Sequence, residues 1–282
     1  MAGEVLVDHG PLAPHDLQHF FRVDADVVLV GGQALAFWAD AYGILSSAAA
    51  AGLTRDIDFF GNRTAAKEHA LRLRAHFPNR VSYKLATLND PPPSSAVICV
   101  SDYLGVAEPL IIDYVIAMAG YVADTEARMF ARAIPVDAYG VSFRVMHPFD
   151  CLKSRVHNLI SIPAKRTELG IEQCRTAVAV ARAVLEATCA EGGAAERDRA
   201  LPLAEAVIEL ALHPNAMDIR QQFAINVLDA IPVDAFVTRF PTHRWPRAVR
   251  YIDDRFARRF RRAPHASADA LRGSTAVVAV CT

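Results

Sequence analysis

Two aspartates, one residue apart, interrupt an apolar stretch in the segment GLTRDIDFFG, residues 52–61. In a β-strand, residues i and i+2 point to the same face, so Asp56 and Asp58 are predicted to project side by side while Ile57 points the other way. Carboxylates held that close repel one another unless a cation neutralises them. Hard ions such as Mg²⁺ prefer oxygen ligands and keep the remaining positions for water and substrate phosphates. The pair therefore indicates a metal site, with two solvated acids at the start of a loop as the alternative.

A third acid lies in another apolar run, PLIIDYVIAM, at residues 109–118. Asp113 is the single charged residue of that run, which the β-branched and aromatic side chains predict to be a strand. A third carboxylate on a strand next to the first pair would complete a two-metal site. Such a site activates an attacking oxygen and stabilises the leaving one. Asp113 is therefore the candidate for the third metal ligand.

A pair of glycines, Gly31 and Gly32, follows the apolar run DVVLV and precedes a helical pattern. Backbone N–H groups at a helix N-terminus attract phosphate, and glycine lets a phosphate approach without a Cβ in the way. Gln33 follows and has an amide that can donate a hydrogen bond. The segment GGQALA is neither a Rossmann fingerprint nor a Walker A motif. We interpret it as a phosphate-binding turn, with tight helix–strand packing as the alternative.

The elements that must position these residues follow from the periodicity of apolar side chains. A strand and turn (26–32), a helix (33–45), a strand (55–60) and a helix capped by Thr64 (64–77) come first. Strands are predicted at 80–88, 95–104, 109–118 and 139–147, the first two separated by the proline-rich NDPPPSS. Helices follow at 147–160, 171–189, 200–213, 216–230 and 245–262. We therefore predict an α/β domain (1–146), a helical domain (147–262) and a flexible tail (263–282).

Composition excludes several classes of function. The net charge of -1 provides no global positive field for nucleic acid. The five cysteines are widely scattered without a Cys-x-x-Cys pair, so neither a zinc site nor a disulfide framework is expected. This cysteine usage, the absence of a signal-like N-terminus and the absence of a long apolar run predict a cytoplasmic protein that does not cross a membrane.

The order of these motifs resembles the nucleotidyltransferase superfamily. LVGGQALAFW (29–38) followed by TRDIDFFG (54–61) is most similar to AbiEii-type nucleotidyltransferase-like proteins, and MHPFDCLKSRVHNL (146–159) is similar to their post-catalytic helix. The resemblance implies an α/β (α+β) fold with a mixed β-sheet, flanking helices and a C-terminal helical bundle. It also implies transfer of a nucleoside monophosphate from an NTP to an acceptor hydroxyl, with two Mg²⁺ ions. Such proteins are known mostly as toxins or phage-defence components, so a cognate antitoxin is a possible partner.

The resemblance assigns roles to individual residues. Asp56, Asp58 and Asp113 would be the catalytic metal ligands, and Lys153 would contact the triphosphate. Gly31, Gly32 and Gln33 would form the nucleotide-binding turn. Two departures are that Gln33 stands where many members have Ser or Thr, and that SSAAAAGL (46–53) lengthens the gap between the glycines and the aspartates. The acceptor is open among tRNA, another RNA, a protein or a small molecule.

Other basic residues suggest weaker hypotheses. Lys165 and Arg166 follow a predicted loop and could also reach phosphates, whereas Arg155 is expected to point elsewhere on its helix. His147 and His157 are interpreted as structural. The rival to an enzyme is a catalytically inactive module that binds a nucleotide or a partner. A third hypothesis, nucleic-acid binding by the arginine-rich helix at 245–262, is less favoured than a helix that docks on the bundle with solvated arginines.

Overall fold

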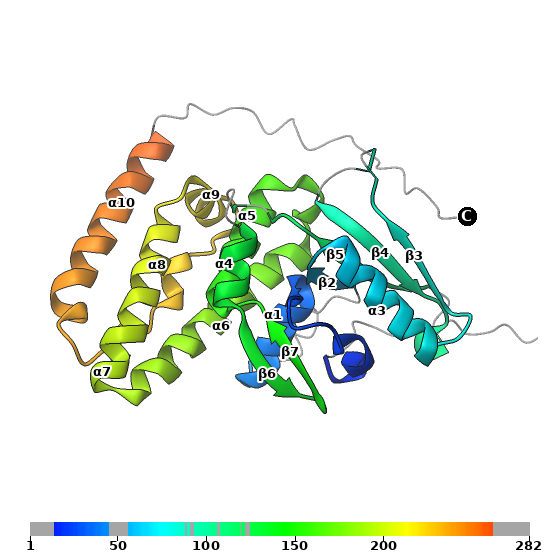
Figure 1. Ribbon diagram of the computed structural model, residues 1–282. Coiled ribbons are helices and arrows are strands. Elements are labelled where there is room, and N and C mark those ends of the chain that lie inside the picture. The colour runs from blue at the N-terminus through cyan, green and yellow to red at the C-terminus, as the bar shows by residue number, and fades with distance from the viewer. Residues whose placement is uncertain are drawn as a thin grey trace, which may run out of the picture.

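A computed structural model describes residues 14–44, 56–87, 89–90, 93–105, 108–118, 120–121 and 125–261 of the chain. The alanine-rich segment at 46–53 and the predicted tail at 263–282 lie outside these described residues. The described part is a mixed α/β structure with a seven-stranded sheet, flanking helices and a helical C-terminal region (Figure 1). The predicted fold class is confirmed.

The sheet has the strand order β3-β4-β5-β2-β1-β7-β6. Its strands are β1 (Val28–Val30), β2 (Ile57–Phe60), β3 (Val81–Leu85), β4 (Ser94–Val100), β5 (Leu110–Val115), β6 (Ile134–Ala138) and β7 (Val141–Val145). β1 is antiparallel to β2 and parallel to β7, and β2 is parallel to β5. The β3–β4, β4–β5 and β6–β7 pairs are antiparallel. The strands that carry the predicted site are therefore the central ones.

Helices cover the sheet and form the C-terminal half. The longer ones are α1 (Gly31–Ala41), α3 (Arg63–His76), α4 (Thr125–Arg132), α5 (Pro148–Ser161), α6 (Glu168–Glu191), α8 (Leu201–Ala211), α9 (Pro214–Phe223) and α10 (Trp245–Arg261). Short helical segments are η1 (Pro14–Phe21), η2 (Tyr103–Gly105), η3 (Pro163–Lys165), α7 (Gly193–Ala195), η4 (Glu196–Ala200), η5 (Val227–Ala230), η6 (Val233–Ala235) and η7 (Phe240–Arg244). Within the described residues, no helix is long and apolar enough to span a bilayer.

The structure differs from the sequence prediction at several places. Asn62, not Thr64, caps α3, because its side-chain oxygen accepts a hydrogen bond from the backbone N–H of Ala65 at 2.9 Å. The helix predicted at 216–230 ends at Phe223, where Ala224 adopts a left-handed conformation that a helix cannot continue through. β6 and α4 were not predicted, because their short segments lack a sustained apolar period.

One continuous hydrophobic core joins the sheet half and the helical half. α1 packs against both α5 and α6, so it lies between the sheet and the helical region. The buried indole N–H of Trp38 in α1 donates to the backbone oxygen of Met146 at 2.8 Å, in the short connection from β7 to α5. The secondary structure changes from strands to helices at this connection, but both halves contribute side chains to the same hydrophobic core.

Candidate active site

Strand register brings two of the three predicted carboxylates together. Asp58 of β2 and Asp113 of β5 are direct partners across the parallel pair, and both are partly buried. Ile57 and Phe59, which alternate with Asp58, are fully buried. Phe59 packs against His69 and Tyr114, whose side chains hydrogen-bond at 2.8 Å. The aspartates therefore occupy the face of β2 that is opposite this apolar layer, as the i, i+2 spacing predicts.

Asp56 lies just before β2 and is exposed. Burial, followed by the negative charges of Asp58 and Asp56, raises the pKa of Asp113 to about 6. Burial also raises the pKa of Asp58, and the charge of Asp56 adds to this rise. The three carboxylates thus act on one another electrostatically, which means that the fold concentrates negative charge at this point.

The first glycine of the Gly-Gly turn is in direct contact with Asp58. β1 pairs with β2 so that Val30 faces Asp58, and α1 begins at the next residue, Gly31. Gly31 has a φ of 70°, and a Cβ added to it would lie 1.9 Å from Oδ2 of Asp58. Only glycine fits this approach. The longer gap between the glycines and the aspartates therefore does not separate them.

The N-terminus of α1 already contacts one carboxylate. The backbone N–H of Gly32 donates a hydrogen bond to Asp58, which opposes the rise in the pKa of that residue. The N-cap residue of α1, Val30, has no side chain that can accept a hydrogen bond. Asp58 on the neighbouring strand therefore caps this helix end instead. Gln33, the third residue of the predicted nucleotide-binding turn, is fully buried within α1. This local use of Gly32 was not predicted from the sequence.

Two cations lie near the carboxylates. The positive charges of Arg155 in α5 and Lys165 in η3 both oppose the rise in the pKa of Asp58, and Lys165 acts in the same way on Asp113. The guanidinium of Arg155 is buried and donates to the side-chain oxygen of Gln173 at 2.7 Å. Its Nε makes no hydrogen bond to any described residue.

Arg155 was expected to point away from the site, and this expectation was wrong. The 100° turn per residue of a helix separates Lys153 from Arg155, but only the packing of α5 against α1 and α6 decides which of the two faces inward. Arg155 faces inward and Lys165 is exposed beside the carboxylates. The sequence signal for Lys165 was its place just after a predicted loop.

Lys153, the predicted triphosphate contact, lies with a different group of residues. Its Nζ is 4.3 Å from the ring centroid of Tyr121, and its charged neighbours are Asp150, Arg132 and Arg128. Burial lowers the pKa of this lysine, as do the two arginines. The structure therefore places Lys153 in the network at the start of α5 and not with the cations that act on Asp58.

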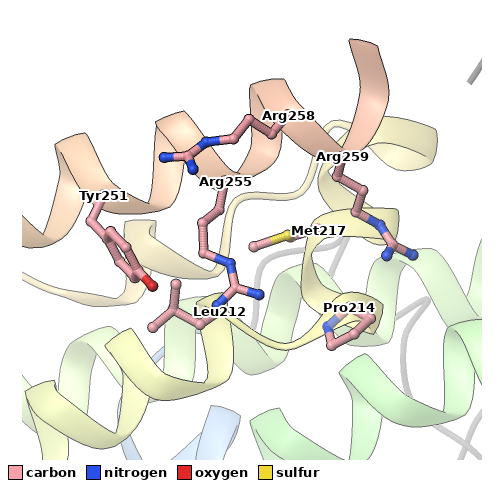
Figure 2. Close-up of a pocket in the computed structure, with 7 residues that line it drawn as sticks. All are labelled: Leu212, Pro214, Met217, Tyr251, Arg255, Arg258 and Arg259. Carbon is pink, nitrogen blue, oxygen red and sulfur yellow. The ribbon is translucent and has the colours of Figure 1, made fainter. Parts of the chain in front are cut away.

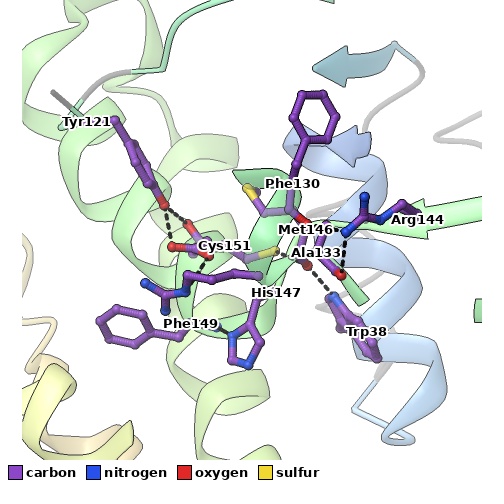
Figure 3. A network of polar contacts seen from close by, with 11 residues as sticks. Trp38, Tyr121, Phe130, Ala133, Arg144, Met146, His147, Phe149 and Cys151 are labelled. Atoms are coloured by element: carbon purple, nitrogen blue, oxygen red, sulfur yellow. Dashed lines mark hydrogen bonds and ion pairs between the residues drawn. The ribbon is translucent and has the colours of Figure 1, made fainter. Parts of the chain in front are cut away.

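This network anchors the start of α5 (Figure 3). The hydroxyl of Tyr121 donates to Oδ1 of the buried Asp150 at 2.7 Å, and Nε of Arg132 in α4 lies 3.3 Å from Oδ2 of the same carboxylate. His147 accepts a hydrogen bond from the backbone N–H of Phe149 and so caps the helix. These contacts hold α4, Tyr121 and α5 together, which supports the structural interpretation of His147.

His157, one turn after Lys153, also has structural contacts. Its Nδ1 is 3.0 Å from the side-chain nitrogen of Asn215, and its ring packs edge-on against that of His213 at 4.5 Å. Burial lowers the pKa of His157 to about 4, which keeps the ring neutral at pH 7. A Cβ on Gly120 would lie 2.1 Å from this ring. We find it packed in the interior, as the sequence interpretation expected.

The chemistry of the three carboxylates suits a hard divalent cation, but their side chains are not positioned around one common point. Asp56, Asp58 and Asp113 supply only oxygen donors, and their mutual repulsion would be relieved by a positive ion. Across the described ranges, no three or more His, Cys, Asp or Glu side chains are arranged as a metal-binding group. The three side chains would therefore have to converge to share an ion.

The site thus combines three features: acidic oxygen donors, two cations, and the positive end of a helix. This combination can hold a metal ion beside a phosphate-bearing molecule. No protein-family model matches the chain, and no curated protein does. The functional argument for this chain therefore rests on the residues and geometry of the site.

Proposed function

We propose that this protein is a Mg²⁺-dependent nucleotidyltransferase, which transfers a nucleoside monophosphate from an NTP to an acceptor hydroxyl and releases pyrophosphate. The observation that carries the proposal is the register of β2 and β5, which sets Asp58 beside Asp113 with the N-terminus of α1 directly adjacent. Three distant parts of the chain, β2, β5 and the start of α1, thus bring two carboxylates and a helix N-terminus together.

Asp56, Asp58 and Asp113 would hold Mg²⁺. When bound, the metal supplies Lewis-acid chemistry, activating the acceptor oxygen and stabilising charge on the phosphate that is attacked. The role of the chain is to hold these oxygens on a rigid central sheet. The fully buried Ile57 and Phe59 lock β2 from its other face. Asp113 would be the third ligand, a role that its pairing with Asp58 across β2 and β5 supports.

The pyrophosphate that leaves carries negative charge, which cations and helix N-termini stabilise. We assign this role to Arg155 and Lys165, whose charges already act on the carboxylates. They take precedence over Lys153, whose ammonium lies against the ring of Tyr121. Lys165 is exposed and would contact the phosphate directly, whereas the buried Arg155 would stabilise it through its charge.

The direct test is transfer of label from each α-³²P-NTP to total cellular RNA or protein with Mg²⁺ present. Wild type and Asp234→Asn, a change to an exposed aspartate far along the chain, should transfer label equally. Asp58→Asn and Asp113→Asn should each lose about 100-fold or more, the usual size of losing one group that stabilises transition-state charge. No transfer from any NTP, or full activity in Asp58→Asn, would refute the proposal.

A second assay separates the cations. Arg155→Gln and Lys165→Gln should weaken turnover about 10-fold or more, the scale of one lost charge-assisted contact of roughly 1.5–3 kcal/mol. Lys153→Gln serves as the matched control on α5 and should change it less than threefold. An equal or larger effect of Lys153→Gln would return the triphosphate role to that lysine.

The rival function is a catalytically inactive module that binds a nucleotide or a partner. Two observations favour it: Asp58 already accepts the N–H of Gly32, and the described side chains are not arranged as a metal-binding group. Calorimetric titration with each NTP distinguishes the two. Saturable NTP binding that is indifferent to Mg²⁺, without transfer to any acceptor, would establish the module.

A further inference from the structure

A second candidate ligand site lies between α9 and α10, on the helical side of the molecule and away from the carboxylates (Figure 1). It is an open cavity of about 480 Å³, a volume typical of small-ligand sites. An apolar floor and a cationic wall line it: Leu212, Pro214 and Met217 form the floor, and Tyr251, Arg255, Arg258 and Arg259 of α10 form the wall (Figure 2). None of the described residues that line it is acidic.

The arginines of the wall differ in whether their charge is already neutralised. Arg259 makes a two-pronged ion pair with Asp218, at 2.8 and 2.9 Å from its Nη2. Among the described residues, Arg258 donates only to the backbone oxygen of Asp254, at 3.3 Å. Neither Arg258 nor Arg255 forms an ion pair with a described carboxylate. Within the described part of the chain, no carboxylate offsets the charge of these two guanidinium groups.

Tyr251 supplies a flat surface beside this charge. Its side chain is 51% exposed, which is unusual for a large aromatic ring, and the guanidinium carbon of Arg255 lies 6.0 Å from its centroid. Figure 2 shows Tyr251 and Arg255 on the same side of α10, both directed toward Leu212. A ligand with both an anionic group and a flat ring would meet matching groups here.

We propose that this cavity binds a phosphorylated nucleoside, either free or as part of an RNA strand, with its phosphate at Arg255 and Arg258 and its base against Tyr251. The planar guanidinium forms paired hydrogen bonds with phosphate oxygens. Bases stack on exposed aromatic rings regardless of their identity. The site is independent of the carboxylates and needs no metal ion, so it goes beyond the proposed transfer reaction.

The test uses the full chain carrying Asp58→Asn, in EDTA, so that metal-dependent binding at the carboxylates does not contribute. Fluorescence anisotropy measures binding of a dye-labelled eight-nucleotide RNA, and unlabelled ATP and adenosine compete. Arg255→Gln, Arg258→Gln and Tyr251→Leu should each weaken binding about 10-fold. Arg247→Gln and Arg250→Gln change exposed arginines of the same helix that do not line the cavity and should stay within twofold.

The competitors identify the source of the phosphate. Competition by ATP at concentrations similar to the RNA supports a free nucleotide, and competition by RNA alone supports a strand. Adenosine should compete at least 10-fold less well than ATP. The proposal is overturned if RNA and ATP both fail to bind at millimolar concentration, if a glutamate octapeptide competes as well as RNA, or if Arg247→Gln weakens binding as much as Arg255→Gln. Loss of transfer activity in the α-³²P assay would leave all of these outcomes unchanged.

Discussion

Replacing Asp113 by asparagine should make the metal-free protein more stable while removing its proposed activity. Burial and the charges of Asp58 and Asp56 raise the pKa of Asp113 from its ordinary value of 3.8 to about 6. The ionised carboxylate is therefore less favourable in the folded protein than in the unfolded chain. Asparagine keeps the shape of the side chain and removes the charge.

The magnitude follows from the shift in pKa. A tenfold change in an equilibrium constant is worth about 1.4 kcal/mol, so a fully buried carboxylate with this pKa would cost the folded state roughly 3 kcal/mol at neutral pH. Asp113 is only partly buried, and solvent screening reduces the cost to about 1–2 kcal/mol. Because the folded pKa is the higher one, the folded protein binds more protons between about pH 4 and 6. This contribution to stability is present below pH 4 and is lost as the pH rises through 6.

Urea denaturation in EDTA at pH 4 and pH 7.5 measures the difference. Asp113→Asn should exceed wild type by about 1–2 kcal/mol in free energy of unfolding at pH 7.5 and match it at pH 4. Adding Mg²⁺ at pH 7.5 should raise the midpoint of wild type and leave that of the variant nearly unchanged. A variant that is less stable than wild type at pH 7.5, or a difference that does not depend on pH, would refute the reasoning.

Three further predictions concern the scaffold, and urea denaturation measures each. Gly31→Ala would put an alanine in a left-handed conformation with its Cβ 1.9 Å from a carboxylate oxygen, so it should lower the free energy of unfolding by at least about 3 kcal/mol. Gly140→Ala is the control: its φ is 73°, but the space around the new Cβ is open, so it should cost about 1 kcal/mol. Asp150→Asn weakens an ion pair whose carboxylate is buried and whose arginine is partly exposed, and it should cost about 2 kcal/mol. Glu205→Gln, in a pair with both members exposed, should cost less than about 1 kcal/mol, and equal costs would contradict this. Burial lowers the pKa of His69 to about 3, so the unfolded chain binds the proton first and this residue alone should cost wild type about 2 kcal/mol of stability between pH 7.5 and 5. The stability of His69→Gln should fall by about that much less over the same range, and an unchanged pH dependence would argue against the reasoning.

Sequence periodicity was sufficient for the class of fold and for most of its central elements. The apolar strand before Gly31, the strand carrying Asp58 and the run around Asp113 appear as β1, β2 and β5. These segments are recognisable because buried strands of β-branched and aromatic residues have a strong local signal. The short β6 and α4 have a weak one and were missed.

Alternation along a strand also determined that Asp58 and Ile57 face opposite sides, since that property depends only on local backbone geometry. The sequence likewise pointed to Gly31 as a position where a side chain would interfere. It did not reveal the cause, which is the carboxylate of Asp58 at the place of the missing Cβ. That contact exists because β1 pairs with β2, which places Val30 opposite Asp58, 28 residues later in the sequence.

Only the tertiary structure decided which charges surround the carboxylates. Asp58 and Asp113 are neighbours because β2 and β5 pair in one register, and a slip of one residue would turn Asp113 to the other face. Arg155 faces inward because α5 buries that side against α1 and α6, leaving Lys153 to contact Tyr121. Helical periodicity separates the two basic residues, but the choice of the buried face depends on long-range packing that no local pattern encodes.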